Sequence, residues 1–219
     1  MIYGHKFLPE NYINESVLFN SKDFVYNLDK FEQEKTNILF ITGYSGGGKS
    51  YLSRELAKKY NVELVEYDVI SFIYKHKNKI DKNSLIGRFF SENVLAKKYL
   101  ESGKKDLQYS IDVLYPELMG FIQLNNYRCI VEGMQVFMAI EAGAVDENFY
   151  RDYAMIIKGT SAIKSSFRAI KRDFGPDRPD NYSKPTFEKL KSILRRLKNM
   201  AVNINGNEKA FKSIKDNLK

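Results

Sequence analysis

Short apolar runs alternate with stretches of helical periodicity along most of this sequence. Four runs predict buried strands because they are rich in aliphatic residues and are bounded by polar or glycine-containing segments. Residues 51–60, which lie between the first two runs, have the pattern of an amphipathic helix. Strands that alternate with helices in this way indicate an α/β fold. The predicted strands are 38–42, 62–65, 130–131 and 153–158.

The segment 69–126 is too long for a simple connection between two strands, and its pattern is mostly helical. One helix is expected to begin at Asn83 or Ser84 and to run to about Ser102, where Gly103 breaks it. We interpret the segment as a helical insertion that covers a substrate. Its aromatic side chains could face that substrate or pack in the core, and we expect the core for Phe89, Phe90, Tyr109 and Tyr115.

Three further elements flank this central part. Ser21 can cap a helix over 22–34, where Phe24, Leu28 and Phe31 recur at helical spacing. Near the C-terminus, a helix is expected over 186–200, followed by a short final strand. That strand is expected over 201–205.

The stretch that follows the first predicted strand carries the most specific motif of the chain. It matches G-x-x-x-x-G-K-[ST], the phosphate-binding loop, from Gly43 to Ser50. Glycines let the backbone approach a phosphate closely, and Lys49 can reach the β- and γ-phosphates. The alternative is a glycine-rich turn that binds nothing, but the Lys49-Ser50 pair would serve no folding purpose there. The residues expected to bind ATP are Gly43, Ser45, Gly46, Gly47, Gly48, Lys49, Ser50 and Tyr51.

Two acidic residues follow later predicted strands. Asp68 falls at the carboxyl end of the second strand, where ligands bind in open α/β sheets. It could take the proton of a substrate hydroxyl, hold Mg²⁺ or cap the next helix, and these roles are compatible. Glu132, followed by Gly133, ends the third strand. We expect Ser50 and Glu132 to hold Mg²⁺, Glu132 through water; the alternative is a solvated glutamate at a strand end.

Three arginines follow the fourth predicted strand. Arg168 and Arg172 lie four residues apart and therefore share one helix face, where they repel each other unless an anion binds between them. Arg178 lies on the next loop. We interpret 160–182 as a lid that adds these arginines to a transferring phosphate. Alternatively, they form surface salt bridges with Asp173, Asp177 or Asp180.

Composition limits the remaining possibilities. The 219 residues, 43% of them hydrophobic, fit a single domain, 1–219, that can bury a core. The single cysteine excludes a disulfide framework within the chain. We expect a reducing, cytoplasmic setting; the alternative is that one cysteine carries no information about the compartment. No signal peptide and no apolar run of about 20 residues is present, so we expect no membrane partner. The oligomeric state is not indicated.

The net charge of +8 is concentrated near the C-terminus. Residues 184–219 hold ten Lys or Arg against three Asp or Glu, an excess of +7. Such an excess is compatible with nucleic-acid binding. The simpler interpretation, which we favour, is a phosphate-handling enzyme that is basic near its site and has lysine-rich surface helices.

Taken together, these motifs resemble the P-loop small-molecule kinases, with the closest likeness to the uridine kinase and phosphoribulokinase group. In that group a strand ends in Glu-Gly, and a lid helix carries R-x-x-x-R-D with a further Arg. The matching positions here are Glu132-Gly133, Arg168, Arg172-Asp173 and Arg178.

This resemblance implies a three-layer, doubly wound parallel sheet of the P-loop NTPase type, with MgATP as the phosphate donor. Asp68 would contact the acceptor, as in that group and in zeta-toxin-like kinases. The resemblance does not identify the acceptor, because residues 69–126 show no recognisable pattern of the family.

The hypothesis is therefore a kinase that moves the γ-phosphate of MgATP to a hydroxyl or phosphate of a small molecule, such as a nucleoside, nucleotide or sugar-like acceptor. Its catalytic residues would be Lys49, Asp68, Arg168, Arg172 and Arg178. Two alternatives stay open. One is a kinase for the 5′-hydroxyl of nucleic acids, and the other is a P-loop regulatory module without kinase activity.

Overall fold

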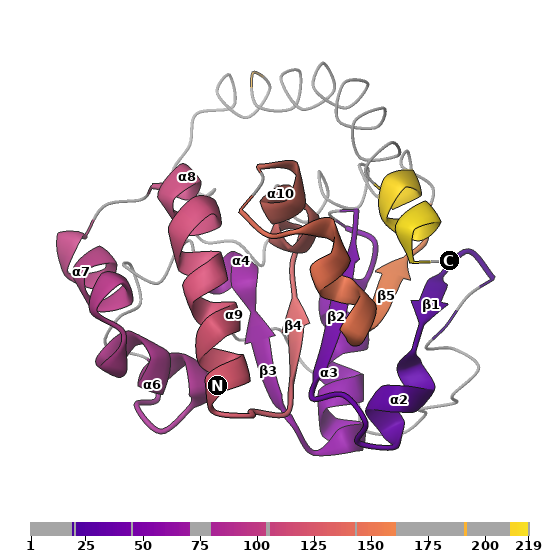
Figure 1. Ribbon diagram of the computed structural model, residues 1–219, viewed down its shortest axis with the longest axis horizontal. Helices are drawn as coiled ribbons and strands as arrows, with labels where there is room; N and C mark the ends of the chain where they lie inside the picture. The colour runs from indigo at the N-terminus through magenta and orange to yellow at the C-terminus, as the bar shows by residue number, and fades with distance from the viewer. Residues whose placement is uncertain are drawn as a thin grey trace.

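Among the residues that the structure describes, five strands form one sheet in the order β1-β5-β2-β4-β3. In this computed structural model the described residues are 19, 21–44, 46–70, 80–103, 106–142, 144–160, 191 and 211–218. Strands β3, β4, β2 and β5 are parallel, and only β1 runs antiparallel to its neighbour β5. The sheet is therefore mostly parallel, and the expected α/β class is confirmed (Figure 1). The strands are β1 Phe24–Tyr26, β2 Ile38–Gly43, β3 Glu63–Glu66, β4 Cys129–Glu132 and β5 Ala154–Lys158.

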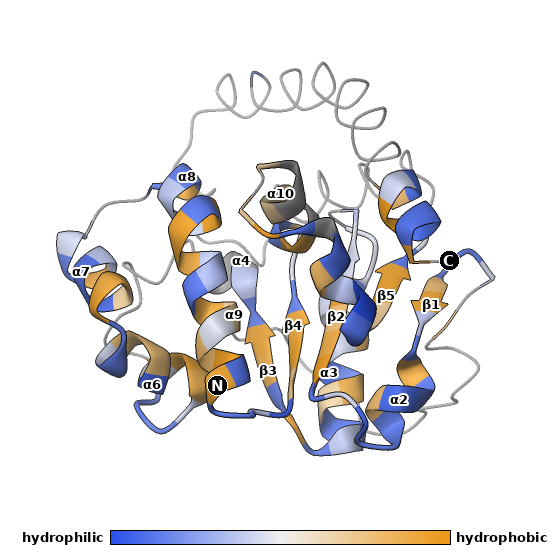
Figure 2. Ribbon diagram, in the orientation of Figure 1, coloured by the Kyte–Doolittle hydropathy of each residue, from blue (hydrophilic) through white to orange (hydrophobic). Residues whose placement is uncertain are grey.

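Helices cover both faces of this sheet, which explains why its strands read as continuous apolar runs. All residues of β2, β4 and β5 are buried, and Figure 2 shows these strands as hydrophobic along most of their length. On one face, helices α2 (Leu28–Glu32) and α3 (Lys49–Tyr60) pack through Phe31, Leu52 and Leu56 against alternate residues of the strands.

The other face is covered by the helical insertion and the helices that follow β4. Side chains at Phe40, Val65 and Val131 point to this face and pack against Phe89, Tyr115 and others. The elements on or beside this face are α4 Tyr67–Ile70, α6 Leu85–Glu92, α7 Val94–Ser102, α8 Leu107–Tyr109, the π-helix η2 Ser110–Leu114, α9 Tyr115–Leu124, α10 Gln135–Glu141 and the 3₁₀ helix η3 Glu147–Asp152.

Capping residues divide the first part of the insertion into two helices, α6 and α7, where the sequence predicts one. Ser84 begins α6, and its hydroxyl accepts a hydrogen bond from the Gly87 N–H at 3.1 Å. The single helix expected through Ser102 is broken at Asn93, because Asn93 takes an extended conformation and caps α7 with its own side chain. Gly103 then ends α7 at a φ of 64°, as expected.

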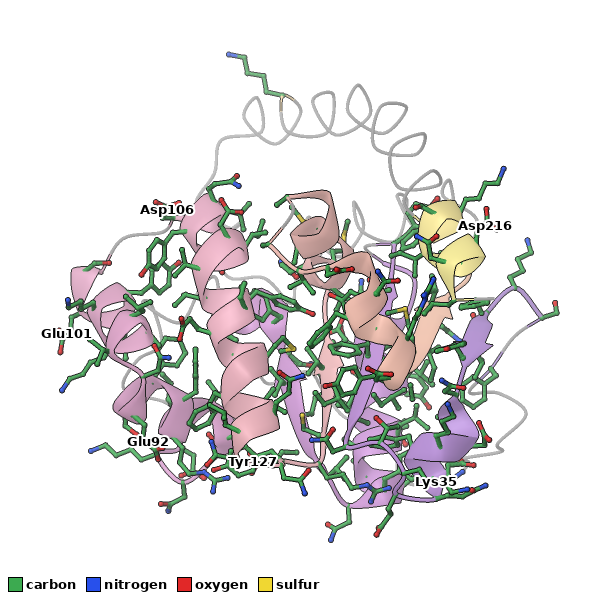
Figure 3. The ribbon with its side chains drawn as sticks, viewed as in Figure 1. Lys35, Glu92, Glu101, Asp106, Tyr127 and Asp216 are labelled. Atoms are coloured by element: carbon green, nitrogen blue, oxygen red, sulfur yellow. The ribbon has the colours of Figure 1, made fainter. Side chains whose placement is uncertain are left out.

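The aromatic residues of the insertion behave mainly as core. Phe89, Phe90 and Tyr115 are buried, whereas Tyr109 is half-buried and stacks on Tyr99 with a centroid distance of 5.6 Å. Helices α8, η2 and α9 run in direct succession, with Asp106 at one end and Tyr127 beyond the other (Figure 3).

The prediction of a helix over 22–34 is wrong for the first half of that segment. Residues Phe24–Tyr26 form β1 instead, and Asn27, at a φ of 50°, separates this strand from the short helix α2. Pairing with β5 overrides the local helical spacing, since Phe24 pairs with Ile157 and Tyr26 with Met155.

Several predicted elements lie outside the described residues. They are most of the lid 160–182, all but residue 191 of the helix 186–200, and the strand 201–205; residues 1–18 and 71–79 lie outside as well. Near the C-terminus, residues 211–217 form a helix, and Phe211 and Ile214 join the core. Within the described part of the chain, no helix is both long enough and apolar enough to span a membrane.

Candidate functional site

The loop between β2 and α3 adopts backbone conformations that favour glycine. Gly43, Gly46 and Gly48 have φ values of 139°, 82° and 91°. A Cβ at Gly43 would also lie only 2.7 Å from the Lys158 carbonyl oxygen, because Gly43 pairs with Lys158 across β2 and β5. Glycine is therefore required at the point where the chain leaves the central strand.

This loop leads directly into the N-terminus of α3. Gly48 is the N-cap and, as a glycine, has no side chain with which to accept from the first N–H groups of the helix. The first N–H groups of a helix have no partner within the helix and form a favourable site for an anion. The loop and the helix start therefore have the arrangement that a phosphate group needs.

Lys49, Ser50 and Glu132 converge beside this loop. The buried Lys49 ammonium donates a hydrogen bond to the Tyr44 carbonyl oxygen at 3.2 Å, and its Nζ lies 3.9 Å from Glu132 Oε1. The Ser50 hydroxyl donates to Glu132 Oε2 at 3.3 Å. Because Glu132 ends β4 and is only 2% exposed, the sheet itself brings the carboxylate to the start of α3.

The hydroxyl oxygen of Ser50 and the carboxylate oxygens of Glu132 are suited to bind a hard cation. Mg²⁺ prefers oxygen ligands and is bound in proteins by one or two carboxylates, while waters and substrate phosphates complete its shell. Ser50 and Glu132, the pair expected to hold Mg²⁺, are the two oxygen-bearing side chains that meet here. Among the described residues, no group of three or more His, Cys, Asp or Glu could hold a metal ion without such help.

The remaining predicted site residues are placed only in part. Asp68 lies in α4, two residues beyond Glu66, which pairs with Glu132, so its backbone is at the same edge of the sheet. The Asp68 side chain is outside the described atoms, and its role stays a prediction. Tyr51 is 49% exposed on α3. Ser45, Arg168, Arg172 and Arg178 lie outside the described residues.

A buried ion pair beside the loop carries no signal in the sequence. Asp23, which precedes β1, accepts hydrogen bonds from Lys158 Nζ and from the Gly159 N–H, each at 2.7 Å. The Asp23 side chain is 1% exposed. These contacts join the residue before β1 to the end of β5, where Lys158 pairs with Gly43. Thr160 lies beside the loop as well, since its methyl group would be 3.3 Å from a Cβ at Gly47. Asp23 and Lys158 are 135 residues apart, and no local motif joins them.

A tyrosine joins the end of β3 to the helical insertion. The hydroxyl of Tyr67, the residue before Asp68 in the sequence, donates to the Ser110 carbonyl oxygen at 2.5 Å. That carbonyl also accepts the Tyr115 N–H of the π-helical turn. Burial raises the pKa of Tyr67 well above its ordinary value. The phenol therefore stays protonated at neutral pH and acts as a fixed hydrogen-bond donor.

A scan against protein-family models gave no match for this chain, and neither did a search of curated proteins. Its function is therefore inferred from its own residues.

Proposed function

We propose that this chain is an ATP-dependent phosphotransferase of the P-loop type. It moves the γ-phosphate of MgATP to a hydroxyl or phosphate of a small molecule, such as a nucleoside, nucleotide or sugar-like acceptor. The observation that carries the proposal is the convergence of Lys49, Ser50 and Glu132 at a glycine-rich loop and at a helix start whose N-cap is Gly48.

The position of this loop in the sheet supports a doubly wound architecture. From β2 the chain passes through α3 to β3, on one side, and later returns to the other side as β5. In open α/β sheets, ligands bind where the chain changes direction in this way, at the carboxyl ends of the strands. Gly43, at the end of β2, lies at this point.

A connecting turn alone would not explain the buried charges. Moving an ammonium and a carboxylate out of water is costly, and their mutual attraction offsets that cost only where the geometry is close. Lys49 and Glu132 are both nearly fully buried, yet Nζ and Oε1 are 3.9 Å apart. A bound polyphosphate would add charge-assisted hydrogen bonds to the Lys49 ammonium, and this accounts for a buried lysine at the loop.

In the proposed reaction, the residues act mainly by position and charge. The N–H groups of the loop and of α3 bind phosphate oxygens, and Lys49 neutralises charge on the β- and γ-phosphates. Ser50 would hold Mg²⁺ directly and Glu132 through water, and the bound ion would supply further charge neutralisation. Asp68 orients or deprotonates the acceptor hydroxyl, and Arg168, Arg172 and Arg178 close over the transferring group.

Binding and transfer can be tested separately. Titration calorimetry with MgATP on the wild type and on Lys49→Met should show binding only in the wild type. Lys58→Met, which changes an exposed lysine of the same helix, is the matched control and should bind normally. Asp68→Asn should bind MgATP as the wild type does but lose transfer. Equal binding by Lys49→Met would contradict the proposal.

A further inference from the structure

Two buried polar side chains near the loop have no role in the mechanism above. Thr42, the residue before Gly43, is 0% exposed, and Gln135, at the start of α10, is 6% exposed. Thr42 Oγ1 and Gln135 Oε1 have no hydrogen-bond partner among the described residues. Buried polar atoms in native proteins are nearly always paired, so both atoms require an explanation.

Both side chains lie on the insertion side of the sheet. Along β2, Ile38 and Phe40 point to that side, whereas Leu39 and Ile41 point to the α3 side. Strand alternation therefore turns Thr42 toward the insertion side. Gln135 belongs to α10, whose Val136 packs in the core of the same side.

Gly133 brings the two side chains into one neighbourhood. Ile41 pairs with Glu132 in parallel register, so Thr42 is the neighbour of Gly133 across β2 and β4. A Cβ at Gly133 would lie 2.7 Å from Gln135 Oε1 and 3.2 Å from the Tyr67 Cβ. Gly133 thus leaves room for the Gln135 amide, with Thr42 on one flank and Tyr67 on the other.

Packing does not require polar side chains at these positions. Valine and threonine both carry two heavy atoms on Cβ, and methionine has nearly the shape of glutamine, so an apolar pair would fill about the same volume. An apolar pair would also avoid burying polar atoms without partners. The polar atoms therefore point to a partner that arrives from outside the chain.

We propose that Thr42 and Gln135 form a subsite that binds a neutral hydroxyl group of the phosphate acceptor, an inference that rests on the proposed kinase function. A hydroxyl can donate to Gln135 Oε1 and accept from Thr42 Oγ1, which satisfies both atoms. A phosphate dianion has no hydrogen to donate to Gln135 Oε1. The subsite accordingly selects an alcohol group over a phosphate ester at this position.

The place of the subsite fits this role. Glu132 and Gly133 are consecutive, so the proposed metal-binding carboxylate is on the α3 side of β4 and the subsite is on the other side. Tyr67 flanks the subsite and immediately precedes Asp68, the expected contact of the acceptor. A hydroxyl held here would therefore lie at the carboxyl edge of the sheet, beside the residue that precedes Asp68.

The test compares the wild type with Thr42→Val, Gln135→Met and the double variant as full-length chains. The probes are glycerol, ribose, glucose and thymidine, each beside its phosphate monoester, added to the MgATP-bound protein. Thermal unfolding without probe and MgATP affinity are measured first. We expect both to be preserved, with the melting temperature of the variants equal to or above that of the wild type, because unpartnered polar atoms have been removed.

At least one alcohol should then raise the melting temperature of the wild type, and its affinity should fall about tenfold in each single variant, the loss of one hydrogen bond. Three results would overturn the subsite: no free alcohol binds, whether or not its phosphate monoester does; the alcohol binds the double variant as tightly as it binds the wild type; or the variants unfold at lower temperature than the wild type without probe, as expected if the two atoms only hold buried water. Failure of the kinase proposal can be distinguished from these three results, because in that case the wild type does not bind MgATP.

Discussion

Ser50 donates its hydroxyl hydrogen to Glu132 across 82 residues of sequence, with Oγ and Oε2 3.3 Å apart. This contact joins the start of α3 to the end of β4, and with Lys49 it forms the charged centre of the candidate site. The first predictions test this centre and the backbone that supports it.

Glu132→Gln should raise the Mg²⁺ concentration that gives half-maximal activity by at least about tenfold, because it removes the only described carboxylate at the proposed metal position. The amide oxygen can still accept from Ser50, so the local geometry is retained. The measurement is phosphate transfer or ATP hydrolysis as a function of Mg²⁺ at constant ATP. Glu34→Gln, which changes an exposed glutamate, is the control. An unchanged Mg²⁺ dependence would remove Glu132 from the metal site.

Alanine substitution should affect three glycines in a defined order. Gly43→Ala combines positive φ with a backbone collision and should cost more than about 2 kcal/mol of unfolding free energy. Gly48→Ala has open space and should cost only the strain of positive φ, about 1 kcal/mol. Gly120→Ala, within α9 and with no atom near its Cβ, should stabilise by about 0.5–1 kcal/mol. Urea denaturation measures all three, and a Gly43→Ala variant as stable as Gly48→Ala would contradict the register of β2 and β5.

Asp23→Ala should destabilise the fold by about 3–5 kcal/mol, because it leaves Lys158 buried without its carboxylate. Adding Lys158→Met should restore much of this loss, since the uncompensated charge is then gone. The comparison is Glu32→Ala, whose partner Lys59 is exposed, with an expected loss below about 1 kcal/mol. If the double variant is no more stable than Asp23→Ala, the buried ammonium is not the cause of the loss.

The single cysteine reports on the core. Cys129 is 0% exposed in β4, and burial raises the pKa of its thiol from 9.0 to about 12. The native protein should therefore not react with a thiol reagent at pH 8, and one thiol should react after unfolding in guanidinium. A fast reaction in the native state would contradict the buried position of β4.

The same pKa predicts a dependence of stability on alkaline pH. The folded state keeps the Cys129 proton between pH 9 and about 12, whereas the unfolded state loses it, so this contribution to stability is complete below pH 9 and is lost as the pH rises toward 12. The stability advantage of the wild type over Cys129→Ala should shrink by up to about 1.4 kcal/mol per pH unit in that window. Parallel pH profiles of the two proteins would contradict the assignment.

The sequence predicts the central sheet well because its signals are local. Residues Ile38–Gly43 are an unbroken apolar run between a polar segment and a glycine-rich loop, and a strand covered on both faces requires such a run. The loop and its lysine are likewise contiguous in the chain. The sequence also predicts that Ser50 and Glu132 belong to one site, since both are expected to hold Mg²⁺, but it does not predict the hydrogen bond between them.

Features that depend on distant pairing could not be predicted. Phe24, Leu28 and Phe31 fit a helix, but Phe24 and Tyr26 also alternate as in a strand, and only β5 decides between the two. The Asp23–Lys158 pair has no motif for the same reason. Gln135 becomes conspicuous only when its buried amide oxygen is seen over Gly133.

The most direct test of the central claim is transfer of label from γ-labelled MgATP to a panel of nucleosides, nucleoside monophosphates, sugars, nucleotide-sugars and 5′-hydroxyl oligonucleotides. The wild type and Lys58→Met should form a labelled product, and Lys49→Met and Asp68→Asn should form none. A labelled product that persists in Lys49→Met, or tight MgATP binding by the wild type without transfer to any member of the panel, would contradict the account of this chain as a small-molecule kinase.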